Sequence, residues 1–454
     1  MKNNFKKISA AFIAGMLMVP TVQAATLEER VSELEANQSL NILNFSGTFI
    51  TRFDDIISAK QTQPATVLGQ PSTFDNKDLT YLRMKFQFNV DANVSKNIKF
   101  YSRLTTSKNF NSFYQQGLSG LPVSDDLQAS NSYQSSHVVL EKAYIDMTVP
   151  DTGLTFFIGR LPTVDGQPQN YKDGRARMGT YPMLSYDSVL DGMGVSYKMD
   201  QYMPEGHSLA LRALYTPFAQ YYAGANGAYI TAPTKQNGSA LPTSSTGYGL
   251  MADYSINNMS WADGMGLTLL NFQTSDLYYA NPAWVSVGTT PGMDSNLTLS
   301  VGGTTLAWEL NGIAHTGWDL SLSYLASTLK SNGRLMSGVP GTGFGMSSDD
   351  GSESGSTFLL STRYRLGTWI FGGEWVNGSE NSFYYATAAE DLTQFYSTHG
   401  NGYHLYVTKK FTQNLAFRVG YMLQDYDYTP TGIGPVVESD RKIETAYANL
   451  RLDF

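Results

Sequence analysis

The last nine residues of the chain alternate without interruption between two kinds of side chain. Ala446, Ala448, Leu450, Leu452 and Phe454 are apolar, and Tyr447, Asn449, Arg451 and Asp453 between them are polar or amphipathic. Successive side chains of a β-strand point to opposite faces, so this pattern predicts a strand with one apolar and one polar face. The aromatic carboxyl end is typical of strands whose apolar face contacts lipid and whose polar face lines a lumen.

Sixteen segments repeat this alternation and are separated by turn residues. The expected strands are 43–54, 79–92, 97–108, 138–149, 153–160, 188–199, 207–217, 247–256, 265–275, 299–311, 317–328, 356–366, 369–378, 402–411, 414–427 and 441–454. Short connections follow the even-numbered segments and mostly long ones follow the odd-numbered segments, as in barrels with both chain ends in the periplasm. The expected fold is an all-β, transmembrane, antiparallel up-and-down barrel of about 16 strands, within about 14 to 18.

The first 41 residues predict two further segments. Three lysines precede the apolar stretch 8–19, and small residues end at Ala24, which predicts a secretory signal peptide over 1–24. Apolar residues at helical spacing predict a short amphipathic periplasmic helix over 25–41. This helix would either self-associate or cap the barrel rim. The barrel itself is expected over 42–454.

Composition excludes other classes of protein. After residue 24 no stretch reaches the ~18 to 20 continuous apolar residues of a membrane helix, and lipid cannot satisfy open backbone groups. A membrane protein with this sequence must therefore be a closed barrel. Cysteine is absent, which excludes disulfides and thiol chemistry, and the net charge of −8 argues against a nucleic-acid partner.

The apolar set fixes the outward face of each expected strand, so the other alternate positions face inward. The inward cations would be Arg52, Arg83, Lys85, Lys99, Arg103, Lys142, Lys198, Arg212, Arg363, Arg365, Lys410, Arg418 and Arg451. The inward anions would be Asp54, Asp91, Asp146, Asp253, Glu309, Asp319, Glu374 and Asp453. The excess of about five positive charges would favour anions if these groups face water unpaired in a wide barrel. Alternatively, they pair with loop carboxylates and hold loops in place.

The third long connection, 161–187, contains three glycines and three prolines, which argues against a strand. Its main charged residues are Asp165, Lys172, Asp173, Arg175 and Arg177.

The whole pattern resembles the general bacterial porins. The segments FFIGRLPTVDG, YKDGRARMGTYP, LDGMGVSYKM and LEERVSELEANQS are similar to an uncharacterised porin-like family of Gram-negative bacteria with a short N-terminal helix. The resemblance implies that the third long loop narrows the lumen, with its five charged residues at the constriction and Arg52, Arg83, Lys85 and Lys99 as the facing cluster. It also implies a homotrimer, and recognition of the strand ending in Phe454 by the barrel-assembly machinery. The loop of general porins is chiefly acidic, whereas this one is mixed, so their cation preference does not carry over.

The leading hypothesis is a passive, water-filled porin of the cell outer membrane that admits small hydrophilic solutes and mildly prefers anions. A substrate-specific channel for a sugar or organic acid is an alternative, with Tyr101, Tyr144 and Tyr406 as scattered lumen aromatics. A structural sheath barrel is another. An enzyme is not expected, because the five histidines, His137, His207, His315, His399 and His404, form no hydrolase or metal motif. No catalytic residue, metal or cofactor is expected.

Overall fold

The computed structural model describes residues 42–67, 70–109, 134–175, 177–219, 222–223, 229–231, 244–275, 277–278, 298–332, 352–383, 391–429 and 438–454. The expected signal peptide and amphipathic helix lie outside these residues. Two compact units divide the chain, Met1–Asn44 and Phe45–Phe454, and the barrel features below belong to the second. Within the described ranges, no helix has the length and apolar character needed to cross a membrane.

Strands make up most of the described chain. They are β1 (Leu43–Val67), β2 (Gln70–Ser95), β3 (Ile98–Asn109), β4 (Gln134–Thr148), β5 (Leu154–Arg160), β6 (Asp191–Lys198), β7 (His207–Ala219), β8 (Tyr222–Ala223), β9 (Tyr229–Thr231), β10 (Ser244–Asn257), β11 (Gly264–Ser275), β12 (Leu277–Tyr278), β13 (Thr298–Asn311), β14 (Trp318–Asn332), β15 (Ser352–Leu366), β16 (Trp369–Gly378), β17 (Gly400–Lys410), β18 (Leu415–Tyr426) and β19 (Lys442–Asp453). The helices are short: α3 (Asn170–Asp173), η1 (Asp200–Tyr202), η2 (Ile313–His315) and η3 (Phe395–Ser397).

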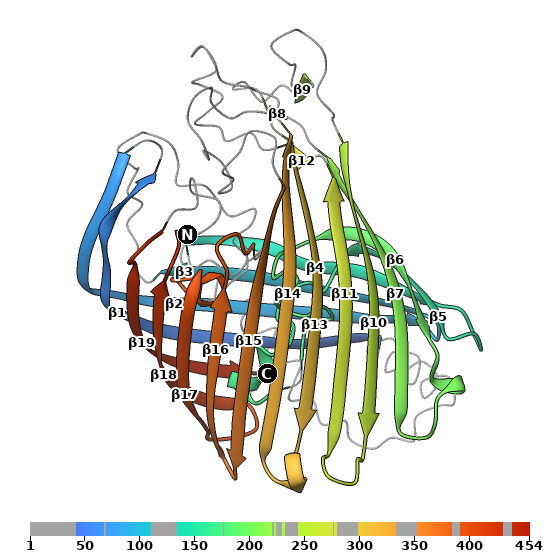
Figure 1. Ribbon diagram of the computed structural model, residues 1–454. Coiled ribbons are helices and arrows are strands. Elements are labelled where there is room, and N and C mark those ends of the chain that lie inside the picture. Colours follow the sequence, from blue (N-terminus) through green and yellow to red (C-terminus); the bar gives the residue numbers. More distant parts are fainter. Residues whose placement is uncertain are drawn as a thin grey trace, which may run out of the picture. The chain divides into compact units, whose positions relative to one another are not determined.

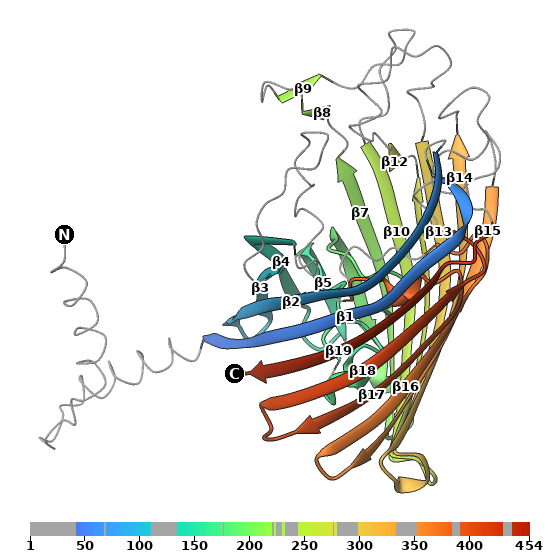
Figure 2. The same ribbon diagram turned by 90° about the vertical axis from the view of Figure 1, so that its left-hand side faces the viewer.

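Sixteen long strands close into one antiparallel barrel. Each pairs with its neighbours along the chain, and β19 pairs with β1 to complete the ring. The two-residue β12 continues the β11 side of β13, and β8 with β9 forms a separate hairpin. In Figure 1 the front strands β13–β15 cross the rear strands β1–β3 at a steep angle, and Figure 2 shows β1 beside β19. The expected sixteen-stranded fold is confirmed.

Alternation along each strand separates an inner from an outer face. In β19 the inward side chains Tyr447 and Arg451 are only 4% exposed, whereas Leu450, Leu452 and Phe454 are 41–51% exposed. The same alternation recurs in β14, β15 and β17. The predicted division into a polar inner and an apolar outer face is therefore present in β19, whereas inward positions of other strands also carry apolar side chains, such as Leu325 and Leu359.

The wall differs from the expected strands in several places, of which three concern the interior or the closure of the barrel. Strands β1 and β2 extend far beyond 43–54 and 79–92, and pairing of β1 with β19 continues to Lys60 opposite Lys442. Strand β6 begins at Asp191 rather than at 188, because the preceding residues belong to a segment inside the barrel. The third difference is an irregular register between β3 and β4 at Arg103 and Leu104.

Candidate functional site

Residues 161–190 leave the wall after β5 and return to it at β6; we call them the inner segment. Figures 1 and 2 show this coil within the ring of strands. Its two arms run side by side, because the Gly179 amide donates to the Asp165 carbonyl at 3.0 Å and the Met183 amide to the Gln167 carbonyl at 3.1 Å. A Cβ on Gly179 would lie 2.2 Å from the Val164 carbonyl oxygen, so this close approach requires glycine. Helix α3 forms the tip.

Asp173 anchors the tip to the far wall. Its Oδ1 accepts a hydrogen bond from Arg418 of β18 at 2.6 Å. Its Oδ2 accepts from Arg451 of β19 at 3.2 Å and from Arg175 of the inner segment at 2.9 Å. Burial alone would raise the pKa of the Asp173 carboxyl, but Arg418, Arg451 and Arg175 hold it well below its usual range. The carboxylate is therefore ionised and makes three charge-assisted bonds.

The carbonyl groups of the tip are also bound by wall residues. Arg363 of β15 donates to the Tyr171 carbonyl at 3.2 Å, and Thr408 of β17 donates to the Lys172 carbonyl at 2.8 Å. Lys410 of β17 donates to the carbonyl of Gly174, the residue that ends α3 in a left-handed conformation. The side of the barrel from β15 to β19 thus holds the tip through both backbone and side chain.

Asp165 ties the base of the inner segment to strand β3. It lies 3.2 Å from Arg103 of β3, and Arg103 also donates to Glu141 of β4 at 3.0 Å. Burial raises the pKa of the Asp165 carboxyl, but Lys85, Arg175 and Arg103 together bring it below the usual range. This contact, like that of Asp173, is a buried ion pair between segment and wall.

A buried polar network joins the inner segment to a second inserted segment, residues 391–399, between β16 and β17. Lys172 Nζ lies 2.7 Å from the hydroxyl of Tyr396 in η3, which donates to the Glu374 carboxylate at 2.9 Å. His404 Nδ1 lies 2.7 Å from the same carboxylate, and His404 Nε2 lies 2.8 Å from the Tyr447 hydroxyl. The network therefore connects two inserted segments with β16, β17 and β19.

Arg177 makes the loosest ion pairs of the inner segment with the wall. Its guanidinium lies 3.9 Å from Asp253 of β10 and 3.8 Å from Glu309 of β13. Arg212 of β7 lies closer to Asp253, at 3.1 Å. All four side chains keep some exposure to solvent, which distinguishes this contact from those of Asp165 and Asp173.

Apolar packing completes the contact between the inner segment and the wall. Tyr181 and Tyr186 pack with the inward residues Phe157, Leu214, Met251 and Leu270. Met183 and Leu184 pack with Leu325, Leu359, Val376, Phe395, Tyr396, Met422 and Tyr447. Because the contacted wall residues belong to strands from β5 around to β19, the inner segment and residues 391–399 lie across the lumen at this level.

This filling corrects the expectation that inward charges face open water unpaired. Arg52, Arg83, Lys85, Arg103, Arg363, Arg418 and Arg451 are buried and have partners. The barrel is too wide for its own side chains to fill, but an inserted stretch of backbone supplies the missing atoms. The alternative hypothesis, in which wall charges pair with loop carboxylates, describes Arg103, Arg418 and Arg451.

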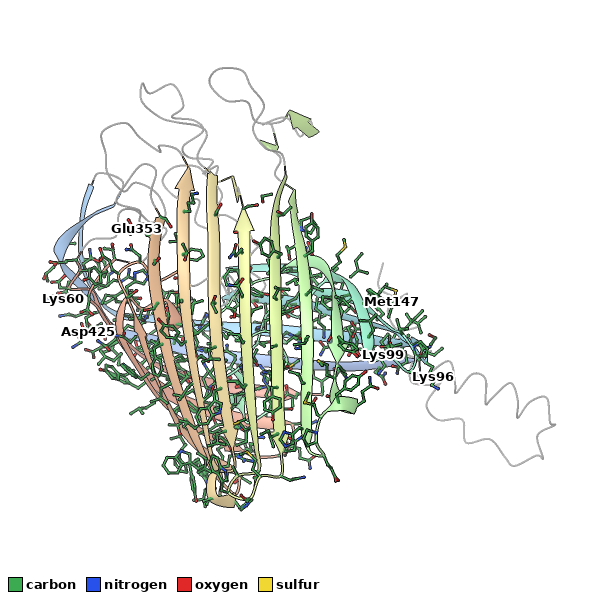
Figure 3. The ribbon with its side chains drawn as sticks, turned by 45° about the vertical axis from the view of Figure 1, so that its right-hand side comes forward. Lys60, Lys96, Lys99, Met147, Glu353 and Asp425 are labelled. Atoms are coloured by element: carbon green, nitrogen blue, oxygen red, sulfur yellow. The ribbon has the colours of Figure 1, made fainter. Side chains whose placement is uncertain are left out.

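The four residues expected as a basic cluster facing the loop have three different acidic neighbours. Arg52 and Arg83 each donate to Asp54 of β1 at 2.8 Å, and Lys85 interacts with Asp165. Lys99 lies opposite Asp146 in the register of β3 and β4. Figure 3 shows Lys99 near Lys96, at the β2–β3 turn.

Glu141 is an inward acid that the regular alternation of the sequence hides. The register of β3 and β4 shifts at Arg103 and Leu104, which face Lys142 and Leu140, and Glu141 is left as an extra residue between these two. Its carboxylate is buried and binds Arg103. No signal in the alternation marks such a bulge, so sequence reasoning missed this partner.

Tyr101 and Tyr144 are cross-strand neighbours rather than scattered residues. Their rings stack with centroids 5.0 Å apart, and Lys142 Nζ lies 5.7 Å from the Tyr101 centroid. Tyr406, the third candidate, lies elsewhere and contacts His404.

Arg365, another expected inward cation, lies 3.0 Å from Asp319 of β14.

Arg160 faces outward at the point where the inner segment leaves the wall. Its guanidinium donates to both Asp191 carboxylate oxygens, at 2.7 and 2.9 Å, and to the Leu140 carbonyl at 2.8 Å. Since Arg160 ends β5 and Asp191 begins β6, this bidentate pair links the two ends of the inner segment from outside the barrel.

The histidines lie in different places. His207 contacts Tyr254, His315 contacts Asp263, and His404 belongs to the buried network. The side chain of His137 lies outside the described residues. In the described parts of the chain, no group of three or more His, Asp or Glu side chains is arranged to hold a metal ion.

The fold and its interior define a class: a closed antiparallel β-barrel with a folded segment inside the lumen. A family described as a protein of unknown function (DUF3373) matches residues 75–211, a range that includes the inner segment. A search of curated proteins gives no match.

Solved structures of outer-membrane barrels are similar over most of the chain. OmpF of Salmonella typhi in complex with daunomycin has 11% identity and a TM-score of 0.45, covering 91% of this chain and 97% of its own. OprB of Pseudomonas putida has 11% identity and a TM-score of 0.48, covering 93% and 97%. The trimer form of OmpT, an outer membrane protein of Vibrio cholerae, has 13% identity and a TM-score of 0.44, covering 91% and 99%. The strand pairing of this chain, and not these similarities, establishes its fold.

Proposed function

We propose that this protein is an outer-membrane channel for small hydrophilic solutes, and that the inner segment sets its permeability. One observation carries the proposal: a charged, hydrogen-bonded segment crosses the lumen of a barrel whose outer face is apolar. A sheath for another protein would need the lumen that the inner segment occupies.

The outer face supports a membrane location. Leu405, near the middle of β17, is 68% exposed although it is apolar, as expected for a side chain in contact with lipid. Trp318, Trp369, Phe411 and Phe454 are exposed near one end of the strands, where aromatic side chains suit the membrane boundary. We assign this end, both chain termini and the short turns to the periplasm.

We propose a mild anion preference for the path that opens when the inner segment moves. With Glu141 added to the inward anions, the wall keeps an excess of about four positive charges, which focuses a positive potential in the lumen. We assign no catalytic role and no cofactor to the barrel.

Two further proposals concern the assembly of the barrel. The Phe454 amide and carbonyl both pair with Gly47, and its ring stacks on Phe86 at 6.2 Å, so the terminal residue takes part in barrel closure. We propose that the barrel-assembly machinery recognises this terminal strand. We also propose a homotrimer in the membrane.

Bilayer recording tests the proposed channel. Because the Met183 amide and the Gln167 carbonyl are hydrogen-bonded, residues 168–182 can be excised and replaced by two glycines with little strain on the remaining chain. The excised variant should give large stepwise openings with an anion-signed reversal potential in a salt gradient, and the intact protein much smaller or rarer ones. Closed bilayers with both proteins, each verified as folded by resistance to sodium dodecyl sulfate, would refute a channel.

A further inference from the structure

Cations from four wall strands converge on the tip of the inner segment. Arg418 and Arg451 bind the Asp173 carboxylate, while Arg363 and Lys410 bind backbone carbonyl groups of residues 171 and 174. Carbonyl groups are uncharged acceptors, and Arg363 and Arg451 also pair with the wall acids Asp319 and Asp453, at 2.6 and 2.7 Å. The formal negative charge that the tip itself brings to these four cations is the Asp173 carboxylate.

The geometry at Asp173 is that of a bound ligand. Separate arginines of adjacent strands engage its two oxygens, Arg418 at 2.6 Å and Arg451 at 3.2 Å. Arg418 and Arg451 lie on the wall and remain there when the tip moves, whereas Asp173 is part of the tip. Guanidinium groups in such an arrangement bind carboxylates from any source.

We propose that Arg418 and Arg451 form a binding site for a carboxylate-bearing solute, and that Asp173 occupies this site as a built-in substitute. An incoming carboxylate displaces Asp173 and frees the tip, and a second carboxylate of the same solute replaces the carbonyl partners of Arg363 and Lys410. The solute class is therefore a small dicarboxylate. The binding site does not depend on the channel function proposed above, whereas the opening of the lumen on binding rests on that function.

The exchange conserves charge, which makes it feasible in a buried place. One carboxylate leaves the arginines and another takes its position, so no guanidinium is left without a counter-ion in the bound state. The low pKa of Asp173 means that the group displaced is an anion that can then be solvated by water. A neutral sugar offers no such replacement and should leave the contact intact.

Calorimetric titration of the detergent-solubilised full-length protein with succinate tests the site. Asp173→Asn removes the internal competitor and should tighten succinate binding about tenfold relative to the unaltered protein. Arg418→Gln should abolish binding. Asp253→Asn is the control, because it removes an acid of β10 that contacts Arg177 of the inner segment, away from β18 and β19, and the affinity of this variant for succinate should stay within about twofold of that of the unaltered protein. Equal affinities for Asp173→Asn and Asp253→Asn, or binding retained by Arg418→Gln, would overturn the proposal.

Hydrogen exchange on the unaltered protein tests the displacement without any variant. The Gly174 amide donates to Tyr171 and the Arg175 amide to Asn170, so both should be protected while α3 is docked. Succinate should speed exchange at these amides, and sodium chloride or sucrose at matched ionic strength or osmolarity should not. Unchanged or slower exchange with saturating succinate would overturn the displacement.

Conductance separates this inference from the proposed function. If succinate binds and α3 exchanges faster but current does not rise, the site is correct and the channel is wrong. If the excised variant conducts but succinate neither binds nor changes the current of the intact protein, the channel stands and the dicarboxylate site is refuted.

Discussion

Asp173 of the inner segment lies 2.6 Å from Arg418 of β18, although 245 residues separate the two in the sequence. Both side chains are buried, and the same carboxylate reaches Arg451 of the next strand. A local loop would contact its own flanking strands β5 and β6. This one crosses the barrel and is held by the far wall, so its position is a property of the complete barrel.

Arg103 should be important for stability because it neutralises two acids at once. Arg103→Gln leaves Glu141 and Asp165 buried without their shared cation, and we expect the free energy of unfolding to fall by about 3 kcal/mol. Urea unfolding in lipid vesicles, followed by tryptophan fluorescence, measures this. Lys96→Gln in the exposed β2–β3 turn is the control and should change stability by less than about 0.5 kcal/mol. Equal effects of the two substitutions would show that the Arg103 pairs are not stabilising.

The buried network should couple the two inserted segments energetically. Tyr396→Phe removes the hydroxyl that links Lys172 to Glu374, and Lys172→Met removes the charge on the inner segment. In a double-mutant cycle on unfolding, we expect a coupling energy of about 1 kcal/mol or more. Additive effects would mean that residues 391–399 and the inner segment are held independently.

Stability should decrease in mild acid because of His399, which lies in the 391–399 segment. Burial lowers its pKa from 6.5 to about 4. Since the unfolded chain takes up the proton first, the stabilisation is complete above pH 6.5 and is lost as the pH falls towards 4, by roughly 2 to 3 kcal/mol. Unfolding measured between these pH values checks this. His399→Gln should reduce the slope of this dependence, whereas His207→Gln should leave it unchanged; a slope in His399→Gln equal to that of the unaltered protein would reject the assignment.

The apolar outer face predicts that a charged side chain introduced near its middle reduces stability more than one introduced at its boundary. Leu405→Arg places a guanidinium near the middle of the apolar face and should reduce stability in lipid vesicles by about 2 to 4 kcal/mol. Phe411→Arg, at the aromatic boundary, should cost about 1 kcal/mol or less. If the two substitutions cost the same, the face around Leu405 does not contact lipid.

The wall of the barrel could be predicted from the sequence because its signals are local. Alternation in segments such as 79–92 and 441–454 identifies strand, face and neighbour at once, and the folded chain has the sixteen strands in that order. The bulge at Glu141 is an exception, since one additional residue changes the pairing without changing the composition.

The filling of the lumen could not be predicted in the same way. The resemblance to the general porins implied a role inside the barrel for Asp165, Lys172 and Asp173. Their partners Arg103, Tyr396 and Arg418, however, lie far away in the sequence. Residues 391–399 carry no sequence signal of insertion beyond a loop-like composition. Contacts of this kind depend on the three-dimensional closure of the barrel and not on any periodicity.

The most direct test of the central claim is a cross-link between the inner segment and the far wall. The chain has no cysteine, so Lys172→Cys with Thr408→Cys introduces a unique pair at a position where the Thr408 hydroxyl contacts the Lys172 carbonyl. We expect rapid linkage by oxidation or a short dithiol reagent in outer-membrane preparations, and little with the control pair Lys172→Cys and Thr105→Cys on β3. Failure of the first pair to link while the control pair links would contradict an inner segment that crosses the lumen to β17.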